Sequence, residues 1–360
     1  MPGLVGAAYN EELPLTAPPA PTVSGGDEVP LYLTFDDNRL LPALFGEHDE
    51  NLARIEQALG VRVTSRGNRV ALSGSTTATN TAKKVFLELY DMLKSNLPVG
   101  GAEVDAVLRI TTSDALSSVE TGRLEAQIQT PKRTILPRSA NQMRYVNALK
   151  KTDLTFGVGP AGTGKTYMAV AVAVSLMSRG HVQRLVLSRP AVEAGERLGF
   201  LPGDLREKVD PYLRPLYDAL YDMMPVDKVN NYLQGGEIEV APLAFMRGRT
   251  LSNAFVILDE AQNTTPVQMK MFLTRLGENS RMAVTGDLSQ VDLPRGTQSG
   301  LDHALSVVGG LADTKVVKFA NIDVVRHHLV TKIVRAYDSH ERGHPDREKV
   351  LQQIDDSGPT

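Results

Sequence analysis

The sequence predicts an α/β protein, with a three-layer sandwich on a parallel sheet in its larger part and a smaller α+β module before it. Two observations lead to the sandwich. Segments typical of strands alternate with segments typical of helices from about residue 138 to 340, which favours a parallel sheet covered by helices on both faces. One of these strands, residues 254–258, is apolar at every position, as expected for a strand buried on both sides.

The N-terminal part divides into a tail and a small module. Residues 1–29 are rich in Pro, Ala, Gly and Thr, and so few bulky apolar side chains predict a disordered tail. Residues 30–100 follow the order β-α-β-β-α, which is similar to that of KH-type RNA-binding domains. A KH domain grips nucleic acid through a G-x-x-G loop, whereas the nearest glycine-bearing loop here is Gly46–Asp49. RNA binding and a protein-protein or oligomerisation role both stay open for this module. Its elements are expected at residues 31–35, 50–59, 61–64, 70–72 and 78–93.

Residues 101–137 are a predicted linker. It is expected to be helical to about residue 128 and then extended through the basic run Thr130–Arg138. Pro131 and Pro137 disfavour helix in the residues that precede them, so a domain boundary is predicted here.

The larger domain is predicted to span residues 138–340. It begins with a helix at 140–150, for which Ser139 is a suitable N-cap, and it closes with a helix at 324–337. A polar tail follows at 341–360. The strands of this domain are expected at residues 154–158, 184–188, 238–240, 254–258, 282–285 and 315–319, with a long insert at 191–234.

A phosphate-binding loop is the strongest functional signal in the chain. The strand at 154–158 runs into G-x-x-x-x-G-K-T, and an apolar helix follows at once. In that context the backbone N–H groups of the loop cradle phosphates, Lys165 binds the β- and γ-phosphates, and Thr166 offers a hydroxyl to Mg²⁺. The alternative without a functional role is a glycine-rich turn between strand and helix with an unrelated lysine. The residues predicted to bind the nucleotide in this loop are Gly159, Pro160, Ala161, Gly162, Thr163, Gly164, Lys165 and Thr166.

Further polar residues follow the predicted strands, at the edge where open α/β sheets bind ligands. Asp259 is the expected carboxylate near Mg²⁺, and Glu260 is the candidate to orient and deprotonate an attacking water. Gln290 is a candidate sensor of the γ-phosphate. Arg326 is a candidate clamp for the transition state, from the same subunit or a neighbour, because its guanidinium is planar and always charged. Arg189 is a second candidate for that role.

Together these motifs resemble the PhoH-like ATPases over about residues 30–340. The resemblance implies a cytoplasmic bacterial ATP-binding protein, associated with RNA metabolism and phosphate starvation, whose RecA-like core is related to superfamily 1 helicases. It also implies that Gln142 reads adenine, that Gln290 couples the nucleotide to strand movement, and that Arg326 belongs to a late arginine motif. The runs that carry the resemblance are Gly157–Thr166, Leu258–Asn263, Thr285–Asp292, Arg189–Glu196 and Asp323–His327.

One departure from helicases predicts an oligomer. A superfamily 1 helicase closes its ATP site between two RecA-like cores, and this chain has motifs for one core only. We therefore expect Arg326 to complete the site of a neighbouring subunit in a homo-oligomer, for which a hexameric ring is one form.

Composition excludes some classes of binding site and of cellular location. The formal net charge is −3 and there are no cysteines, which excludes disulfides and thiolate metal sites. No apolar run reaches the length of a spanning helix, so neither membrane nor secretion is expected. The function predicted is a Mg²⁺-dependent ATPase acting on or with RNA. The alternatives are a nucleotide-dependent regulatory switch or assembly protein that moves no nucleic acid, and a P-loop kinase, which a water-activating Glu260 disfavours.

Overall fold

The computed structural model describes residues 30–112, 126–190, 205–325, 329–330, 333 and 336–337. The tails predicted at 1–29 and 341–360, and part of the long insert, lie outside these residues. Within the described part, no helix has the length and apolar character needed to cross a membrane.

The larger part of the chain is a six-stranded sheet in which every neighbouring pair of strands is parallel, as predicted. The strand order is β11-β6-β10-β9-β7-β8. It places β10 between β6, which leads into the phosphate loop, and β9, which ends before Asp259. The carboxyl ends of three strands therefore meet at one edge of the sheet. The strands are β6 (Leu154–Val158), β7 (Arg184–Arg189), β8 (Ile238–Pro242), β9 (Ala254–Leu258), β10 (Arg281–Gly286) and β11 (Thr314–Lys318).

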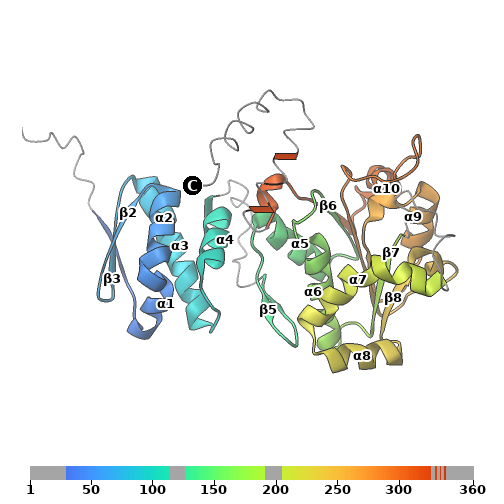
Figure 1. The fold of residues 1–360 in the computed structure, drawn as a ribbon, viewed down its shortest axis with the longest axis horizontal. Coiled ribbons are helices and arrows are strands. Elements are labelled where there is room, and N and C mark those ends of the chain that lie inside the picture. The colour runs from blue at the N-terminus through green and yellow to red at the C-terminus, as the bar shows by residue number, and fades with distance from the viewer. Residues whose placement is uncertain are drawn as a thin grey trace, which may run out of the picture.

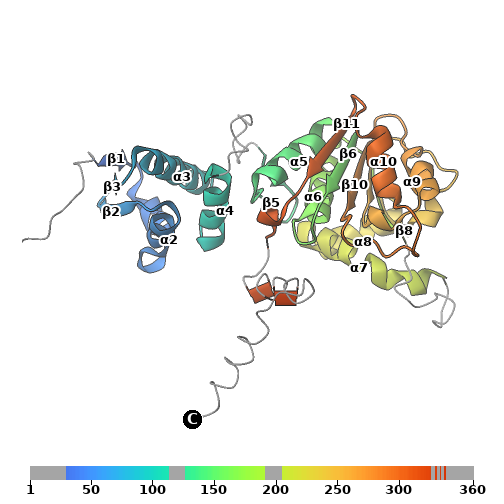
Figure 2. The ribbon, with the colours of Figure 1, turned by 90° about the horizontal axis from the view of Figure 1, so that it is seen from above.

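Helices cover both faces of this sheet, and Figure 2 shows the three layers. One face packs against α5 (Ala140–Lys151), α6 (Lys165–Ser178), α7 (Leu205–Met223) and α8 (Val226–Gly235). The other packs against α9 (Pro266–Leu273) and α10 (Gly300–Val308). Strand β9 packs against both helical layers. Phe255 and Ile257 belong to the core on the face of α5 to α8, while Ala254, Val256 and Leu258 belong to the core on the face of α9 and α10. The all-apolar composition of β9 follows from this double burial.

The N-terminal module is a three-stranded antiparallel sheet, β1-β3-β2, with helices on one face (Figure 1). The predicted order β-α-β-β-α was wrong by one helix, since the observed order is β-α-α-β-β-α. Helix α1 has only five residues, with Pro42 in its first turn, so it is too short to show helical periodicity. The elements are β1 (Leu31–Thr34), α1 (Leu41–Phe45), α2 (Glu50–Leu59), β2 (Arg62–Arg66), β3 (Arg69–Ser73) and α3 (Thr76–Lys94).

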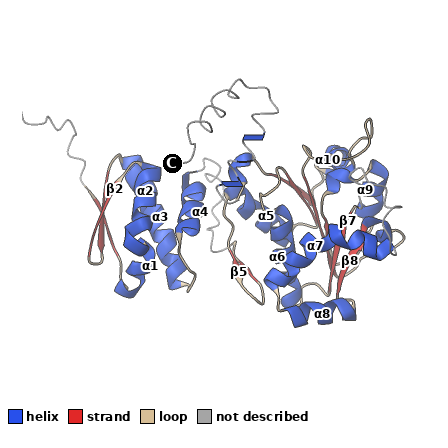
Figure 3. Cartoon of the chain, in the orientation of Figure 1, coloured by secondary structure: helices blue, strands red, loops and turns tan. Residues whose placement is uncertain are grey.

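The linker differs from the predicted helix. Helix α4 (Gly101–Thr112) packs on α2 and α3, and residues 113–125 lie outside the described chain. Strand β4 (Ile128–Gln129) then pairs with β5 (Thr134–Ile135) in a small hairpin. Figure 3 colours β5 as a strand. The expectation of helix to residue 128 was therefore wrong. Ile128 and Ile135 are buried in the core of the larger part, and that burial outweighs the local helical preference.

The last predicted helix begins later than expected. After a 3-10 turn at Asn321–Asp323, Val324 and Val325 are not helical. Leu329, Val330 and three further described residues up to Tyr337 are helical, and Arg326 lies outside the described residues. The long insert, in contrast, contains two helices, α7 and α8, with residues 191–204 outside the description.

Candidate functional site

The phosphate loop connects β6 to α6, and glycine is required where the sequence has it. Gly159 has φ +146°, and a Cβ on it would lie 2.4 Å from the carbonyl oxygen of Phe319. Gly164 caps α6 with φ +80°. Within the loop, the Lys165 ammonium donates to the carbonyl oxygens of Gly159 at 2.6 Å and Pro160 at 2.8 Å. The ammonium is thus held over the loop, at the start of a helix whose N-terminus attracts anions.

The two residues predicted to hold a metal lie together. The Thr166 hydroxyl donates to Oδ1 of Asp259 at 2.5 Å, and the Thr285 hydroxyl donates to the same oxygen at 2.7 Å. Asp259 is only 5% exposed. Mg²⁺ in nucleotide sites takes one or two protein oxygens and completes its shell with phosphates and water. The hydroxyl and carboxylate fit that requirement, and the described residues hold no larger cluster of His, Asp and Glu suited to another metal.

Glu260 lies directly after Asp259 in a strained conformation, with φ +51° and ψ +40°. Left-handed backbone is uncommon for residues other than glycine and gathers at functional sites. One carboxylate oxygen, Oε1, lies 3.3 Å from Nη2 of Arg189, and the other accepts a hydrogen bond from Gln262 at 2.7 Å. The second candidate for a transition-state clamp is therefore paired with the candidate base. Arg189 also donates to the carbonyl oxygen of Tyr212 at 3.1 Å.

Two residues that sequence reasoning did not select, Gln262 and Asp287, join the strand ends. Gln262 is 1% exposed. Besides Glu260, its amide nitrogen donates to the backbone oxygen of Gln290 at 3.1 Å, and its oxygen accepts from the N–H of Asp287 at 3.0 Å. The Asp287 carboxylate accepts from the N–H of Ala161 in the phosphate loop at 3.1 Å. Both residues belong to runs already noted, and their places at strand ends were the available signal.

These groups line a cavity of about 240 Å³. The structure brings Lys165, Thr166, Asp259, Glu260 and Gln290 together in its lining. Gln290 is exposed there, and its own N–H donates to the carbonyl oxygen of Asp287 at 3.0 Å.

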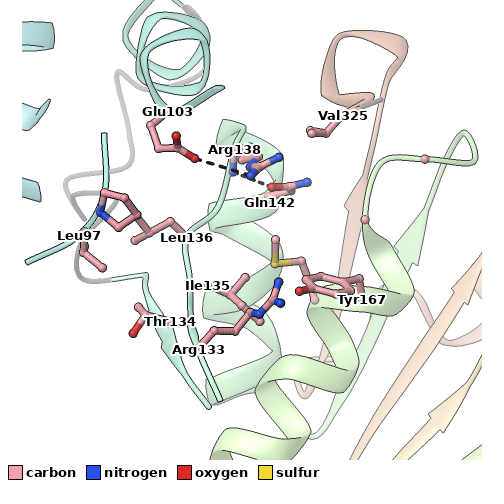
Figure 4. A pocket seen from close by; sticks show the side chains of 14 residues that line it. Leu97, Glu103, Arg133, Thr134, Ile135, Leu136, Arg138, Gln142, Tyr167 and Val325 are labelled. Atoms are coloured by element: carbon pink, nitrogen blue, oxygen red, sulfur yellow. Dashed lines mark hydrogen bonds and ion pairs between the residues drawn. The ribbon is translucent and has the colours of Figure 1, made fainter. Parts of the chain in front are cut away.

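A second cavity, of about 540 Å³, adjoins the phosphate loop on the side of α4 and β5 (Figure 4). The predicted adenine-reading residue, Gln142, lies in its lining and is almost wholly buried. Its oxygen accepts from the N–H of Arg138 at 2.6 Å, and its nitrogen donates to the carbonyl oxygen of Thr163 at 2.9 Å. Gln142 therefore ties the linker to the phosphate loop. Arg138 in turn lies 3.7 Å from the carboxylate of Glu103 on α4.

Tyr167 and Arg133 line the lower end of this cavity in Figure 4. Both contact Asp222 of α7. The Tyr167 hydroxyl donates to Oδ2 at 2.6 Å, and the Arg133 guanidinium lies 2.6 Å from Oδ1. Burial, together with the hydrogen bond to Asp222, raises the pKa of Tyr167 to about 12. A phenol ring and a guanidinium are two planar groups on which a nucleobase can stack.

Arg326 itself is outside the described residues. The residue before it, Val325, donates its N–H to the carbonyl oxygen of Gly162 at 3.0 Å and lines the larger cavity. The backbone thus passes next to the phosphate loop of its own chain immediately before Arg326.

Comparisons with known proteins show which family this chain resembles. Residues 134–338 match the family model described as PhoH-like protein. The chain is 47% identical to the PhoH-like protein of Bacillus subtilis over 82% of this chain and 93% of that protein. It is 49% identical to the PhoH-like protein of Mycobacterium leprae over 84% of this chain and 86% of that one. The protein PhoH of Escherichia coli is 46% identical over 56% of this chain and 58% of its own length.

Among solved structures, a Sulfolobus solfataricus SWI2/SNF2 ATPase core in complex with dsDNA covers 53% of this chain and 45% of its own, with 14% identity. Its TM-score is 0.30.

Proposed function

This chain belongs to the PhoH-like protein family, and from that premise we propose that it is a Mg²⁺-dependent ATPase that acts on or with RNA. The family and the parallel sheet with its phosphate loop make it a nucleotide-binding protein of the P-loop NTPase type. Hydrolysis is proposed because the carboxylate of Glu260 is held by Arg189 on one side and Gln262 on the other. It follows directly after Asp259, which is hydrogen-bonded to Thr166.

Each residue has a proposed role in phosphoryl transfer to water. Lys165 binds the β- and γ-phosphates, and Thr166 and Asp259 hold Mg²⁺, which neutralises the charge that develops on the phosphates. Glu260 orients and deprotonates the attacking water, while Arg189 and Gln262 keep its carboxylate in place. Gln290 reports the presence of the γ-phosphate.

The larger cavity is the proposed site of the adenosine part of ATP. It opens directly from the phosphate loop, since Gly162 and Gly164 line both cavities. Gln142, in the lining of this cavity, is proposed to contact adenine. Tyr167 and Arg133 are proposed to provide planar groups beside the base. The proposed domain division, at the linker 101–137, puts this pocket where the linker meets the larger domain.

Two further proposals concern the assembly and its surroundings. The helical residues after Arg326 expose apolar side chains, with Leu329, Val330, Ile333 and Tyr337 between 40% and 68% exposed. An exposed apolar helix supports a homo-oligomer, such as a ring, in which Arg326 reaches the site of a neighbour. A cytoplasmic location is proposed from the resemblance described above.

Phosphate release from ATP and Mg²⁺, with and without single-stranded RNA, tests the proposed function. Glu260→Gln should leave ATP binding intact and lower turnover on the order of the 10²–10⁴-fold typical of general-base removal. Glu278→Gln makes the same chemical change at an exposed carboxylate and should leave turnover unchanged.

The outcomes separate the alternatives. Turnover that rises with RNA and is lost in Glu260→Gln supports the RNA-coupled ATPase. Turnover indifferent to RNA would favour the nucleotide-dependent switch, and ATP consumption without matching free phosphate would favour a kinase. If Glu260→Gln released phosphate at the wild-type rate, the proposed base would be wrong.

A further inference from the structure

The N-terminal sheet has one face that no described element covers. Leu33, Val70 and Leu72 point into the helices of the module and are buried. Figures 1 and 2 both place this sheet at the end of the molecule away from the large sheet, with its helices between the two. By strand register and alternation, the residues of the opposite, outward face are Tyr32, Thr34, Arg62, Thr64, Arg66, Arg69, Ala71 and Ser73.

This outward face is basic. It carries three arginines, Arg62, Arg66 and Arg69, all of them exposed, and no aspartate or glutamate. Among the described residues, none of the three guanidinium groups forms an ion pair with a carboxylate. Arg66 and Arg69 are also direct partners across the two strands, where like charges repel. A bound polyanion would relieve that repulsion.

An aromatic ring lies among these charges. Tyr32 is 59% exposed, and the guanidinium of Arg69 lies 5.6 Å from the centre of its ring. Exposed aromatic rings and arginine planes on a sheet are surfaces on which unpaired bases stack. Hydroxyl groups of Thr34, Thr64 and Ser73 share the face, and such groups contact phosphate and sugar oxygens.

The loop that a KH domain would use is less suited to the same ligand. Gly46–Asp49 does connect α1 to α2, but it contains Glu47 and Asp49, and His48 and Asp49 have positive φ. Two carboxylates repel a phosphate backbone. Charge therefore favours the outward sheet face over this loop.

We propose that the outward face of the β1-β3-β2 sheet binds single-stranded RNA, with the three arginines on the phosphate backbone and Tyr32 stacked on a base. The proposal rests on the proposed function for its choice of RNA, and it does not depend on ATP hydrolysis. The exposed ring distinguishes RNA from an acidic chain without bases, such as polyglutamate, which would need the arginines alone.

The test is the binding of a fluorescein-labelled oligouridylate to the full-length protein, measured by anisotropy over a range of salt concentrations. The variant Arg62→Gln/Arg66→Gln/Arg69→Gln should bind at least tenfold more weakly. The slope of log affinity against log salt is negative, and its magnitude should decrease by about 2 in this variant. Each of the three lost phosphate contacts on a single strand contributes roughly 0.7. The control Lys83→Gln/Lys84→Gln/Lys270→Gln removes three exposed charges elsewhere and should change binding less than twofold.

A second variant tests stacking separately from charge. Tyr32→Leu should weaken binding by roughly fivefold or more, in line with the loss of one stacked base, while the salt slope stays as in the wild type. Wild-type affinity in the arginine variant would overturn the site. Binding of polyglutamate as tight as that of RNA, with no effect of Tyr32→Leu, would overturn RNA in favour of an acidic protein.

The site and the proposed function can fail independently. Phosphate release without RNA should be the same in the arginine variant and the wild type. If RNA binding depended on the arginines but RNA left phosphate release unchanged, this site would stand and RNA coupling would fall. If RNA stimulated phosphate release equally in the arginine variant and the wild type, the function would stand and this site would fall.

Discussion

Glu260 owes its position to residues around it rather than to its own backbone preference. Left-handed φ and ψ at a non-glycine residue are disfavoured, yet Glu260 adopts them at the end of β9. Arg189 and Gln262 contact its two carboxylate oxygens, and Gln262 is in turn fixed by Asp287 and Gln290. Gln262 is therefore a positioning residue in this arrangement.

Gln262→Ala should lower kcat without weakening ATP binding. The change leaves Glu260 without one hydrogen bond and the buried N–H of Asp287 without its side-chain acceptor, each on the order of 1–3 kcal/mol. At about 1.4 kcal/mol for each factor of ten, the loss at Glu260 alone corresponds to a fall in kcat of roughly 5- to 150-fold. Steady-state phosphate release and a separate ATP-binding titration measure the two quantities.

Gln183→Ala provides the control for this change, because Gln183 is exposed and precedes β7, at the end of that strand opposite Arg189. It should behave as the wild type. An increase in KM with kcat preserved in Gln262→Ala would show that Gln262 serves binding and would contradict its positioning role.

At the scale of elements, the linker is fastened to the larger domain at several points. Lys132 donates its N–H to the carbonyl oxygen of Met223 and its ammonium to that of Tyr221, both at 3.0 Å. Arg133 and Tyr167 meet at Asp222, the adjacent residue of α7. The wall of the larger cavity thus depends on a contact between Arg133, directly before β5, and helices α6 and α7.

Asp222→Ala should weaken ATP binding more than it slows turnover. It removes the hydrogen-bond acceptor of Tyr167 and the ion-pair partner of Arg133, so both planar groups lose their fixed orientation. One such hydrogen bond is worth about 1 kcal/mol, which corresponds to a rise in Kd of about fivefold. Titration with a fluorescent ATP analogue measures the effect.

Asp218→Ala is the matched change one turn earlier on the same helix, at an exposed side chain, and its Kd should equal that of the wild type. A wild-type Kd in Asp222→Ala would show that the larger cavity does not hold the nucleoside.

At the scale of the whole molecule, the proposed homo-oligomer requires Arg326 of one subunit to reach the site of a neighbour. The described contact of Val325 with Gly162 brings the chain close to its own phosphate loop. The apolar residues Leu329, Val330, Ile333 and Tyr337, which follow in the chain, are exposed. Mixing two inactive variants distinguishes action within a subunit from action between subunits.

Lys165→Ala removes the phosphate-binding ammonium, and Arg326→Ala removes the proposed clamp, so each variant alone should have lost most turnover. If Arg326 acts on a neighbour, a mixture of the two should regain activity, because a Lys165→Ala subunit supplies its arginine to an intact loop. A mixture no more active than its components would place Arg326 on its own subunit's nucleotide. Light scattering of the same samples reports whether they are oligomers.

The sequence by itself determined the local features of this protein. Strand β6, the glycine loop and helix α6 were predicted together, because the apolar run, the glycines and Lys165 are adjacent and encode the geometry locally. The parallel sheet also followed from the sequence, since a strand buried on both faces must be apolar throughout. Thr166 and Asp259 were both expected near Mg²⁺ because the carboxyl ends of parallel strands meet at one edge, and the structure brings them within hydrogen-bonding distance.

Only the tertiary structure decided what depends on residues far apart in the chain. Strand order puts β10 between β6 and β9, and this alone brings Asp287 to the loop N–H of Ala161 and Gln262 to Asp287. Ile128, which was expected to lie at the end of a helix, is instead in a hairpin, where it and Ile135 are buried. The basic outward face likewise arises from the register of three strands, which places residues as far apart in sequence as Tyr32 and Ser73 on one surface. Local patterns specify elements, whereas long-range packing specifies which side chains those elements bring together.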